Sequence, residues 1–216
     1  MKDDPKAPVV ILCGGPAPHP KVIEYIPDGA FLMAVDSGLD HARDLGLEPN
    51  LVIGDLDSIS PTGLRWAKEQ NIAIKEFSKD KDKSDLELAL DEAKGISKSI
   101  FVIGSDTGRF DHAFGVIAAL GSATPFFREC HALIGSSYLT FICQNGEIYS
   151  TNGTTVSVFT LGAAASGVAL QGFRWELVNA YLPSGSTLGL SNELLEEVGT
   201  ISVDDGVLVV IQPNSI

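Results

Sequence analysis

The chain has 216 residues and a formal net charge of -13, with 44% hydrophobic and 20% charged residues. This composition is typical of a globular protein with one large domain or two small ones, and it excludes a disordered chain. The negative charge argues against nonspecific binding to DNA or RNA, because phosphate contacts require clustered lysines and arginines.

Cysteine usage and hydropathy indicate the compartment. The 3 cysteines are widely spaced, so we expect no disulfide framework and a reducing environment. The first residues, Met1-Lys2-Asp3-Asp4-Pro5, lack the apolar stretch of a signal peptide. The sequence also lacks the run of about 18 apolar residues that a membrane span requires. We therefore expect a cytoplasmic protein that does not contact a membrane.

Residues 9–120 alternate short β-rich runs with helical stretches, the pattern of βαβ units in a parallel sheet. Ser60-Pro61 and the capping box that begins at Ser84 predict two helix starts, and a further helix is expected over 111–120. Gly14-Gly15, after the first run, completes neither a Walker lysine motif nor a dinucleotide fingerprint. The sequence thus predicts an α/β, Rossmann-like N-terminal domain with a mostly parallel sheet. Its strands are expected at 9–12, 31–35, 51–54, 74–77 and 100–104.

After Pro125 the pattern changes to strands joined by tight turns. Asn145-Gly146 and Asn152-Gly153 are hairpin signals, because both residue types tolerate positive φ. A helix is expected only around 193–197. We predict a C-terminal antiparallel β-sandwich domain, and we divide the chain into domains at 1–130 and 131–216. The strands of the second domain are expected at 138–143, 155–161, 200–203 and 207–211.

Acidic residues follow one predicted strand after another. Asp36 follows the second strand, Asp55 and Asp57 follow the third, and Asp85 opens the helix after the fourth. The carboxyl ends of parallel strands lie at one edge of a sheet, where ligands bind in open α/β folds. Taken singly, each Asp could merely cap a helix. Together they would repel one another unless a cation lies among them, so the pattern predicts a Mg²⁺ site for a phosphorylated ligand.

Two basic residues near these acids are candidate phosphate ligands. Lys81 can neutralise phosphate oxygens as a point charge, and Arg109 can form two parallel hydrogen bonds with a phosphate. Gly108, beside it, lets the backbone approach a phosphate closely. The neighbouring Lys79 and Asp80 are interpreted as part of a solvated loop.

These motifs together resemble the thiamine pyrophosphokinase (thiamine diphosphokinase) family. The family pattern Gly-Asp-x-Asp-Ser is found as Gly54-Asp55-Leu56-Asp57-Ser58, and Lys-Asp-x-Thr/Ser-Asp as Lys81-Asp82-Lys83-Ser84-Asp85. Its Gly-Gly-Arg-x-Asp-His-like loop is found as Thr107-Gly108-Arg109-Phe110-Asp111-His112, with Thr107 where glycine is usual. In the second half, Gly172-Phe173-Arg174-Trp175-Glu176-Leu177 and Ser191-Asn192 are similar to two further family segments. The resemblance covers residues 9–211.

The resemblance implies transfer of a pyrophosphoryl group from ATP to the hydroxyethyl oxygen of thiamine, giving thiamine diphosphate and AMP. It also implies a homodimer whose thiamine site lies between the α/β domain of one subunit and the β domain of the other. Mg²⁺ and the catalytic role would fall to Asp55, Asp57 and Asp85, and ATP and its phosphates to Asp36, Lys81, Gly108, Arg109 and Asp111. Thiamine would be bound by Trp175, Ser191 and Asn192.

Several alternatives stay open. Trp175 could be a core or interface anchor, and Ser191-Asn192 could be a helix cap. Which acid accepts the hydroxyl proton is undecided. The chain could instead be a 6-hydroxymethylpterin diphosphokinase, a haloacid-dehalogenase-like phosphatase with Asp55 as nucleophile, or a non-catalytic module that senses nucleotide or thiamine.

Overall fold

A computed structural model describes residues 7–216, and the chain divides into two compact units. Unit 1 is Met1–Val116 and unit 2 is Ile117–Ile216, so the division falls within helix α4 (Phe110–Ala123). Among residues 7–216, no helix is both long and apolar enough to cross a membrane.

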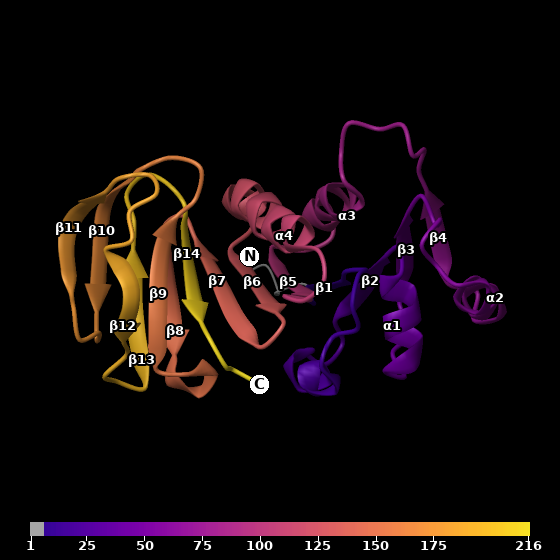
Figure 1. The fold of residues 1–216 in the computed structure, drawn as a ribbon, viewed down its shortest axis with the longest axis horizontal. Coiled ribbons are helices and arrows are strands. Elements are labelled where there is room, and N and C mark those ends of the chain that lie inside the picture. The colour runs from indigo at the N-terminus through magenta and orange to yellow at the C-terminus, as the bar shows by residue number, and fades with distance from the viewer. Residues whose placement is uncertain (1–6) are drawn as a thin grey trace, which may run out of the picture. The chain divides into compact units, whose positions relative to one another are not determined.

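The sheet of unit 1 is parallel and has the strand order β5-β1-β2-β3-β4 (Figure 1). The chain steps outward from β1 to β4, and β5 then returns to the other side of β1. This reversal places a topological switch point between β1 and β5, where ligands bind in open α/β sheets. The strands are β1 (Val9–Leu12), β2 (Phe31–Val35), β3 (Leu51–Gly54), β4 (Ala73–Glu76) and β5 (Ser99–Gly104).

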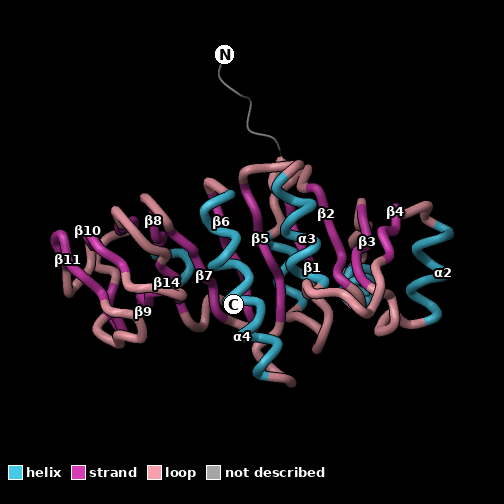
Figure 2. Tube along the Cα trace, turned by 90° about the horizontal axis from the view of Figure 1, so that it is seen from above, coloured by secondary structure: helices cyan, strands magenta, loops and turns pink. Residues whose placement is uncertain are grey.

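Two helices of unit 1, α2 (Pro61–Glu69) and α3 (Asp85–Lys94), begin at the expected capping residues. The Ser60 hydroxyl accepts a hydrogen bond from the Gly63 N–H at 3.0 Å, and Ser84 and Glu87 form a reciprocal capping box. Figure 2 shows these helices in cyan beside the magenta strands. The helical elements are a 3₁₀ turn, η1 (Pro20–Tyr25), and helices α1 (Gly38–Asp44), α2 (Pro61–Glu69), α3 (Asp85–Lys94) and α4.

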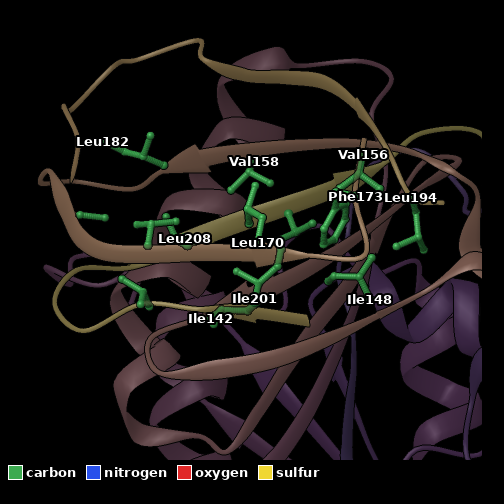
Figure 3. Close-up of a cluster of buried hydrophobic side chains, with 14 residues drawn as sticks. Ile142, Ile148, Val156, Val158, Leu170, Phe173, Leu182, Leu194, Ile201 and Leu208 are labelled. Atoms are coloured by element: carbon green, nitrogen blue, oxygen red, sulfur yellow. The ribbon is translucent and has the colours of Figure 1, made fainter. Parts of the chain in front are cut away.

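Unit 2 contains two antiparallel arrays, β12-β9-β14-β7-β6 and β11-β10-β13-β8. Inward side chains from both arrays, among them Val158, Leu170 and Ile201, form one buried core (Figure 3). The predicted α/β fold with an additional antiparallel β-sandwich is therefore confirmed. The strands are β6 (Glu129–Ile134), β7 (Ser137–Ile142), β8 (Asn145–Tyr149), β9 (Thr155–Thr160), β10 (Ala165–Gln171), β11 (Leu177–Leu182), β12 (Gly189–Glu193), β13 (Val198–Ser202) and β14 (Leu208–Gln212), with 3₁₀ turns η2 (Thr124–Phe126) and η3 (Ser150–Asn152).

Two local predictions in unit 2 are wrong. Asn145-Gly146 does not turn a hairpin but begins β8, which pairs with β13 in the other array from β7. The helix expected at 193–197 is not formed, because Glu193 ends β12 and Leu194 bridges to Phe173. In both cases the pairing between distant segments decides the structure, and local residue preferences do not.

The division of the chain between Val116 and Ile117 follows from the packing of the second half of α4. Gly121 of α4 approaches Leu161 so closely that a Cβ at Gly121 would lie 2.7 Å from Leu161 Cδ1. The last turns of α4 therefore pack with the β-rich unit. The division into a nucleotide-binding domain at 1–130 and a thiamine-binding domain at 131–216 stays a prediction.

Gly38 fixes the distance between α1 and β1, and this gives a first prediction. A Cβ at Gly38 would lie 2.2 Å from the Leu12 carbonyl oxygen, a backbone atom that cannot move aside. We expect Gly38→Ala to lower the free energy of unfolding by about 2 kcal/mol or more. The matched control is Gly115→Ala in α4, where no atom of the described chain within 4 Å would meet a Cβ. That change should stabilise the protein by about 0.5–1 kcal/mol. Urea denaturation measures both, and equal stability of Gly38→Ala and the parent would contradict this packing.

Candidate active site

Three carboxylates and one ammonium group gather beyond the carboxyl ends of β2, β3 and β4. We call Asp36, Asp55 and Asp85 the acid cluster. Lys81 Nζ lies 2.9 Å from Asp85 Oδ1 and 4.0 Å from Asp55 Oδ2, and these three side chains are at most 18% exposed. The predicted convergence of acids from successive strand ends is thus present for these residues in unit 1.

Within the acid cluster, the carboxyl group of Asp36 has a strongly raised pKa. Burial, and then the negative charges of Asp85 and Asp55, raise the pKa of Asp36 from 3.8 to about 7. Burial alone would lower the pKa of Lys81, but Asp85, Asp55 and Asp36 together raise it. One ammonium group therefore does not offset three carboxylates.

The backbone around Asp36 is shaped for this arrangement. Asp36 and Leu56 both have positive φ, 48° and 65°, which is uncommon for residues other than glycine. Gly54 has a φ of 150°, and a Cβ there would lie 1.7 Å from Asp36 Oδ1. The Asp36 N–H donates to the Ile53 carbonyl at 3.1 Å. Only glycine at position 54 therefore leaves room for the Asp36 carboxylate against β3.

Asp57 is oriented differently from the acid cluster. Its carboxylate is half exposed and accepts a hydrogen bond from Lys79 Nζ at 2.5 Å, which lowers the pKa of Asp57. Its backbone N–H donates to Asp55 Oδ1 at 3.1 Å. Lys79 is 65% exposed and lies in a solvated loop, as interpreted, but its ion pair with Asp57 was not predicted. Sequence spacing did not reveal it, because the pair joins residues on two different strand-end loops.

The acid cluster fits a hard divalent cation in its chemistry, although it is not pre-formed as a metal site. Within the described residues, no three His, Cys, Asp or Glu side chains are arranged ready to hold a metal. Among residues 7–216, the buried oxygens Asp36 Oδ1 and Asp85 Oδ1 lack a well-formed hydrogen bond, although Asp85 Oδ1 forms an ion pair with Lys81. Carboxylate oxygens are the ligands that Mg²⁺ prefers. The carboxylates of the acid cluster therefore fit Mg²⁺ in their chemistry, and Lys81 occupies the position beside them in this structure.

The predicted phosphate loop follows β5. Gly108 has a φ of 79°, and a Cβ there would lie 2.9 Å from Pro16 Cγ, so this loop packs against the segment after β1. Arg109 is 70% exposed and forms an ion pair with Asp111, in which Nη2 and Oδ2 are 2.5 Å apart. This hydrogen bond raises the pKa of Arg109 and lowers that of Asp111. Asp111 thus orients Arg109 beside the switch point.

The predicted thiamine residues lie in unit 2, in the loop between β10 and β11 and in β12. The Trp175 side chain is 57% exposed, which excludes a core role, whereas Asn192 is 4% exposed. Asn192 Oδ1 accepts from the Trp175 N–H at 3.1 Å, and its Nδ2 donates to the Trp175 carbonyl at 2.8 Å. The helix-cap interpretation of Ser191-Asn192 is wrong, because both residues lie in β12. Asn192 therefore acts by holding Trp175.

The Trp175 loop is pinned at a second point. Arg174 Nη1 lies 2.9 Å from Glu193 Oε2, and the Arg174 guanidinium lies 5.2 Å from the centroid of the Trp175 ring. Ser191, at a φ of 58°, donates its N–H to Ser157 Oγ at 3.1 Å. The exposed Trp175 side chain thus extends from a loop whose backbone is hydrogen-bonded to Asn192 and whose Arg174 pairs with Glu193.

Unit 2 also contains an open groove of about 630 Å³, lined by residues of β6, β7, β8, β10 and β13. It includes Arg128, His131 and Tyr149 among its polar lining residues. Trp175, Ser191 and Asn192 do not line it. The groove is therefore separate from the thiamine residues that the sequence predicts.

Comparison with known proteins agrees with this geometry. The family described as thiamin pyrophosphokinase, catalytic domain, matches residues 23–132, and its vitamin B1 binding domain matches residues 145–208. The chain belongs to the thiamine pyrophosphokinase family. It is 29% identical to the thiamine pyrophosphokinase of Bacillus subtilis over 207 residues, covering 94% of this chain and 96% of the relative. The predicted family is confirmed.

Solved structures of the family share the fold. A crystal structure of thiamine pyrophosphokinase from Bacillus subtilis matches with a TM-score of 0.83 at 27% identity, covering 96% of this chain and 99% of the other. One from Geobacillus thermodenitrificans matches with a TM-score of 0.80 at 26% identity, covering 95% and 96%. Both units of the chain therefore belong to one known architecture.

The raised pKa of Asp36 predicts a pH-dependent stability. The unfolded chain releases the Asp36 proton near 3.8, but the folded protein releases it near pH 7. The stabilisation from this proton is therefore fully present below pH 3.8 and is lost as the pH rises through about 7. We expect Asp36→Asn, which tolerates the positive φ, to be more stabilising at pH 8 than at pH 5. Urea unfolding in EDTA measures the difference, and a pH-independent effect would contradict the prediction.

Proposed function

We propose that this chain is a thiamine diphosphokinase that transfers a pyrophosphoryl group from ATP to thiamine. The observation that carries the proposal is the acid cluster at the carboxyl edge of the parallel sheet. This part of the chain matches the catalytic domain of the thiamine pyrophosphokinase family. The vitamin B1 binding domain that matches unit 2 supports thiamine as the acceptor.

The proposed reaction is a direct displacement. The hydroxyethyl oxygen of thiamine attacks the β-phosphorus of ATP, and the bond from this phosphorus to the oxygen that bridges to the α-phosphorus breaks. AMP leaves with the bridging oxygen, and the hydroxyl proton passes to a carboxylate. Transfers of this kind depend mainly on positioning and charge stabilisation.

Asp55, Asp57 and Asp85 would hold Mg²⁺, with Asp36 beside them at the metal or nucleotide. When bound, Mg²⁺ neutralises charge on the polyphosphate and on the departing AMP. Lys81, which in this structure neutralises Asp85, would then turn its ammonium group toward phosphate oxygens. Lys79 would release Asp57 in the same rearrangement.

The remaining predicted ATP residues would act at the switch point. Gly108 keeps the loop after β5 close to Pro16, and Asp111 aims the Arg109 guanidinium outward, where it can bind phosphate. These roles require no change in the loop that the structure shows.

Trp175 would receive thiamine. Its exposed aromatic face attracts the cationic thiazolium ring, and Asn192 keeps the indole in place. Ser191, exposed in β12, would contribute a hydroxyl group nearby. We also propose a homodimer in which unit 2 of one subunit completes the site on unit 1 of the partner. It is supported by exposed apolar side chains on the edge strands β11 and β12 and directly before β12: Val178, Tyr181, Leu188 and Leu190.

The alternative functions lack comparable support. A pterin diphosphokinase and a phosphatase with Asp55 as a covalent nucleophile leave the vitamin B1 binding domain unexplained. A module that only senses thiamine would use this domain, but it would leave the match to the catalytic domain of the family without a role. Asp55 also lies beside Lys81 within the acid cluster, and direct transfer requires no phosphoenzyme.

The direct test is product analysis with Mg²⁺, ATP and thiamine. We expect thiamine-dependent release of AMP, abolished by EDTA. Asp85→Asn should lower kcat/KM by about 100-fold or more, because it removes a charge from the acid cluster. Asp80→Asn, an exposed acid of the same loop that lies outside the family pattern, is the matched control and should change it by less than about twofold. Formation of ADP, or AMP release without thiamine, would overturn the proposal.

A mixing experiment tests the shared site. Asp85→Asn and Trp175→Ala should each inactivate the protein, but in unit 1 and unit 2 respectively. If each site combines two subunits, a mixed dimer contains one site with both defects and one intact site. Random exchange should then restore about one quarter of the parent activity. No recovery, despite subunit exchange measured by a tag, would show that each chain builds its own site.

A further inference from the structure

The loop after β1 is held by two side chains of the α1 region. Gly15 has a φ of 99°, and its carbonyl oxygen lies 2.8 Å from His41 Nε2. Because a carbonyl only accepts hydrogen bonds, His41 Nε2 is the donor. The Gly15 N–H donates to Ser37 Oγ at 3.3 Å. Both backbone polar groups of Gly15 are therefore bound by residues that follow the neighbouring strand, β2.

The use of Ser37 for this contact is unusual. Ser37 is the N-cap residue of α1, yet its hydroxyl makes no capping bond to the backbone of Gly38–Asp44. The side chain of an N-cap serine ordinarily accepts a hydrogen bond from the backbone of its own helix, and this bond stabilises the helix. Here the hydroxyl binds the β1 loop instead, and Gly14 makes room for it, since a Cβ there would lie 2.6 Å from Ser37 Oγ.

The same contacts connect the loops of the candidate active site. The Ser37 N–H donates to Ser58 Oγ in the loop that carries Asp55 and Asp57. Pro16, directly after Gly15, lies against Gly108 of the phosphate loop. The β1 loop therefore lies between the acid-bearing loops and the Arg109 loop, at the switch point. Apart from Gly14–Pro16, no described residue has an atom within 4 Å of the position that a Cβ at Gly15 would occupy, so a ligand can approach Gly15 from that side.

We infer that Ser37 and His41 are positioning residues for the nucleotide. Their hydrogen bonds to Gly15 hold the β1 loop, and through Pro16 the Arg109 loop, at a fixed distance from the acid cluster. The polyphosphate must contact Arg109 and the acid-bound cation at once, so a loose β1 loop weakens nucleotide binding. Thiamine contacts in unit 2 do not depend on this loop. The inference rests on the proposed function for its choice of ATP as ligand.

The test is His41→Phe, which keeps a ring of similar size and removes the donor. A hydrogen bond of this kind contributes about 0.5–1.5 kcal/mol, so we expect KM for ATP to rise about three- to tenfold. KM for thiamine and kcat should change by less than about twofold. His41→Gln, whose amide can donate to the Gly15 carbonyl, should restore most of the ATP affinity. Ser37→Ala is the second variant and should show the same selective loss.

The matched control is His19→Gln, an exposed histidine whose ring bonds locally to the Lys21 N–H at 3.2 Å. It should leave all three constants at the parent values. Equal effects on both substrates, or no rescue by His41→Gln, would mean that His41 only supports the fold and would overturn the inference.

Equilibrium binding separates this inference from the proposed function. The probe is Mg²⁺ with α,β-methylene-ATP, whose α–β bridge cannot be cleaved, measured by calorimetry. Three- to tenfold weaker binding to His41→Phe supports the inference even if thiamine proves not to be the acceptor. Unchanged binding, or no binding by the parent protein, overturns it.

Discussion

The fold of unit 1 is organised around repulsion between like charges. Asp36, Asp55 and Asp85 follow three neighbouring parallel strands, so the sheet itself brings them together. The protein tolerates this only because Asp36 keeps its proton to about pH 7 and Lys81 lies among the acids. Neither device removes the excess negative charge at higher pH. A divalent cation would remove it, which is why we interpret the cluster as functional.

Three consecutive residues directly after β2 have three different roles. Asp36 supplies a carboxylate at positive φ, Ser37 links two neighbouring loops, and Gly38 lets α1 approach the Leu12 carbonyl. None of these properties stabilises a helix start in the ordinary way. The positive φ of Asp36 and the missing side-chain cap make the start of α1 less stable. This is consistent with a segment whose conformation serves ligand binding.

The sequence predicted the parts of the structure that depend on local chemistry. The buried strands of unit 1 and the caps at Ser60 and Ser84 follow from apolar runs and hydroxyl groups, and they are present. Asn145-Gly146 failed as a hairpin because pairing of β8 with β13 is decided by a segment far along the chain. The expected helix after Asn192 failed for the same reason, since β12 pairs with β9.

The candidate site shows the same limit. The acids were found because each stands next to an apolar run, whereas partners from different loops left no pattern to detect. Lys79 pairs with Asp57, and His41 with Gly15, across more than 20 residues of sequence. Asn192 was predicted to contact thiamine, but its amide is bound to the backbone of Trp175. Spacing along the chain identifies residues that gather at the carboxyl edge of the sheet. Only the tertiary contacts distinguish residues that can contact a ligand from residues that position other side chains.

The most direct measurement is a ¹³C NMR titration of the Asp36 carboxyl group, assigned by comparison with Asp36→Asn, without and with Mg²⁺. Without the metal, the midpoint should lie at about 7, and Mg²⁺ should lower it, because a cation stabilises the ionised carboxylate. A midpoint at the ordinary value near 3.8 that does not respond to Mg²⁺ would show that the acids do not share one site.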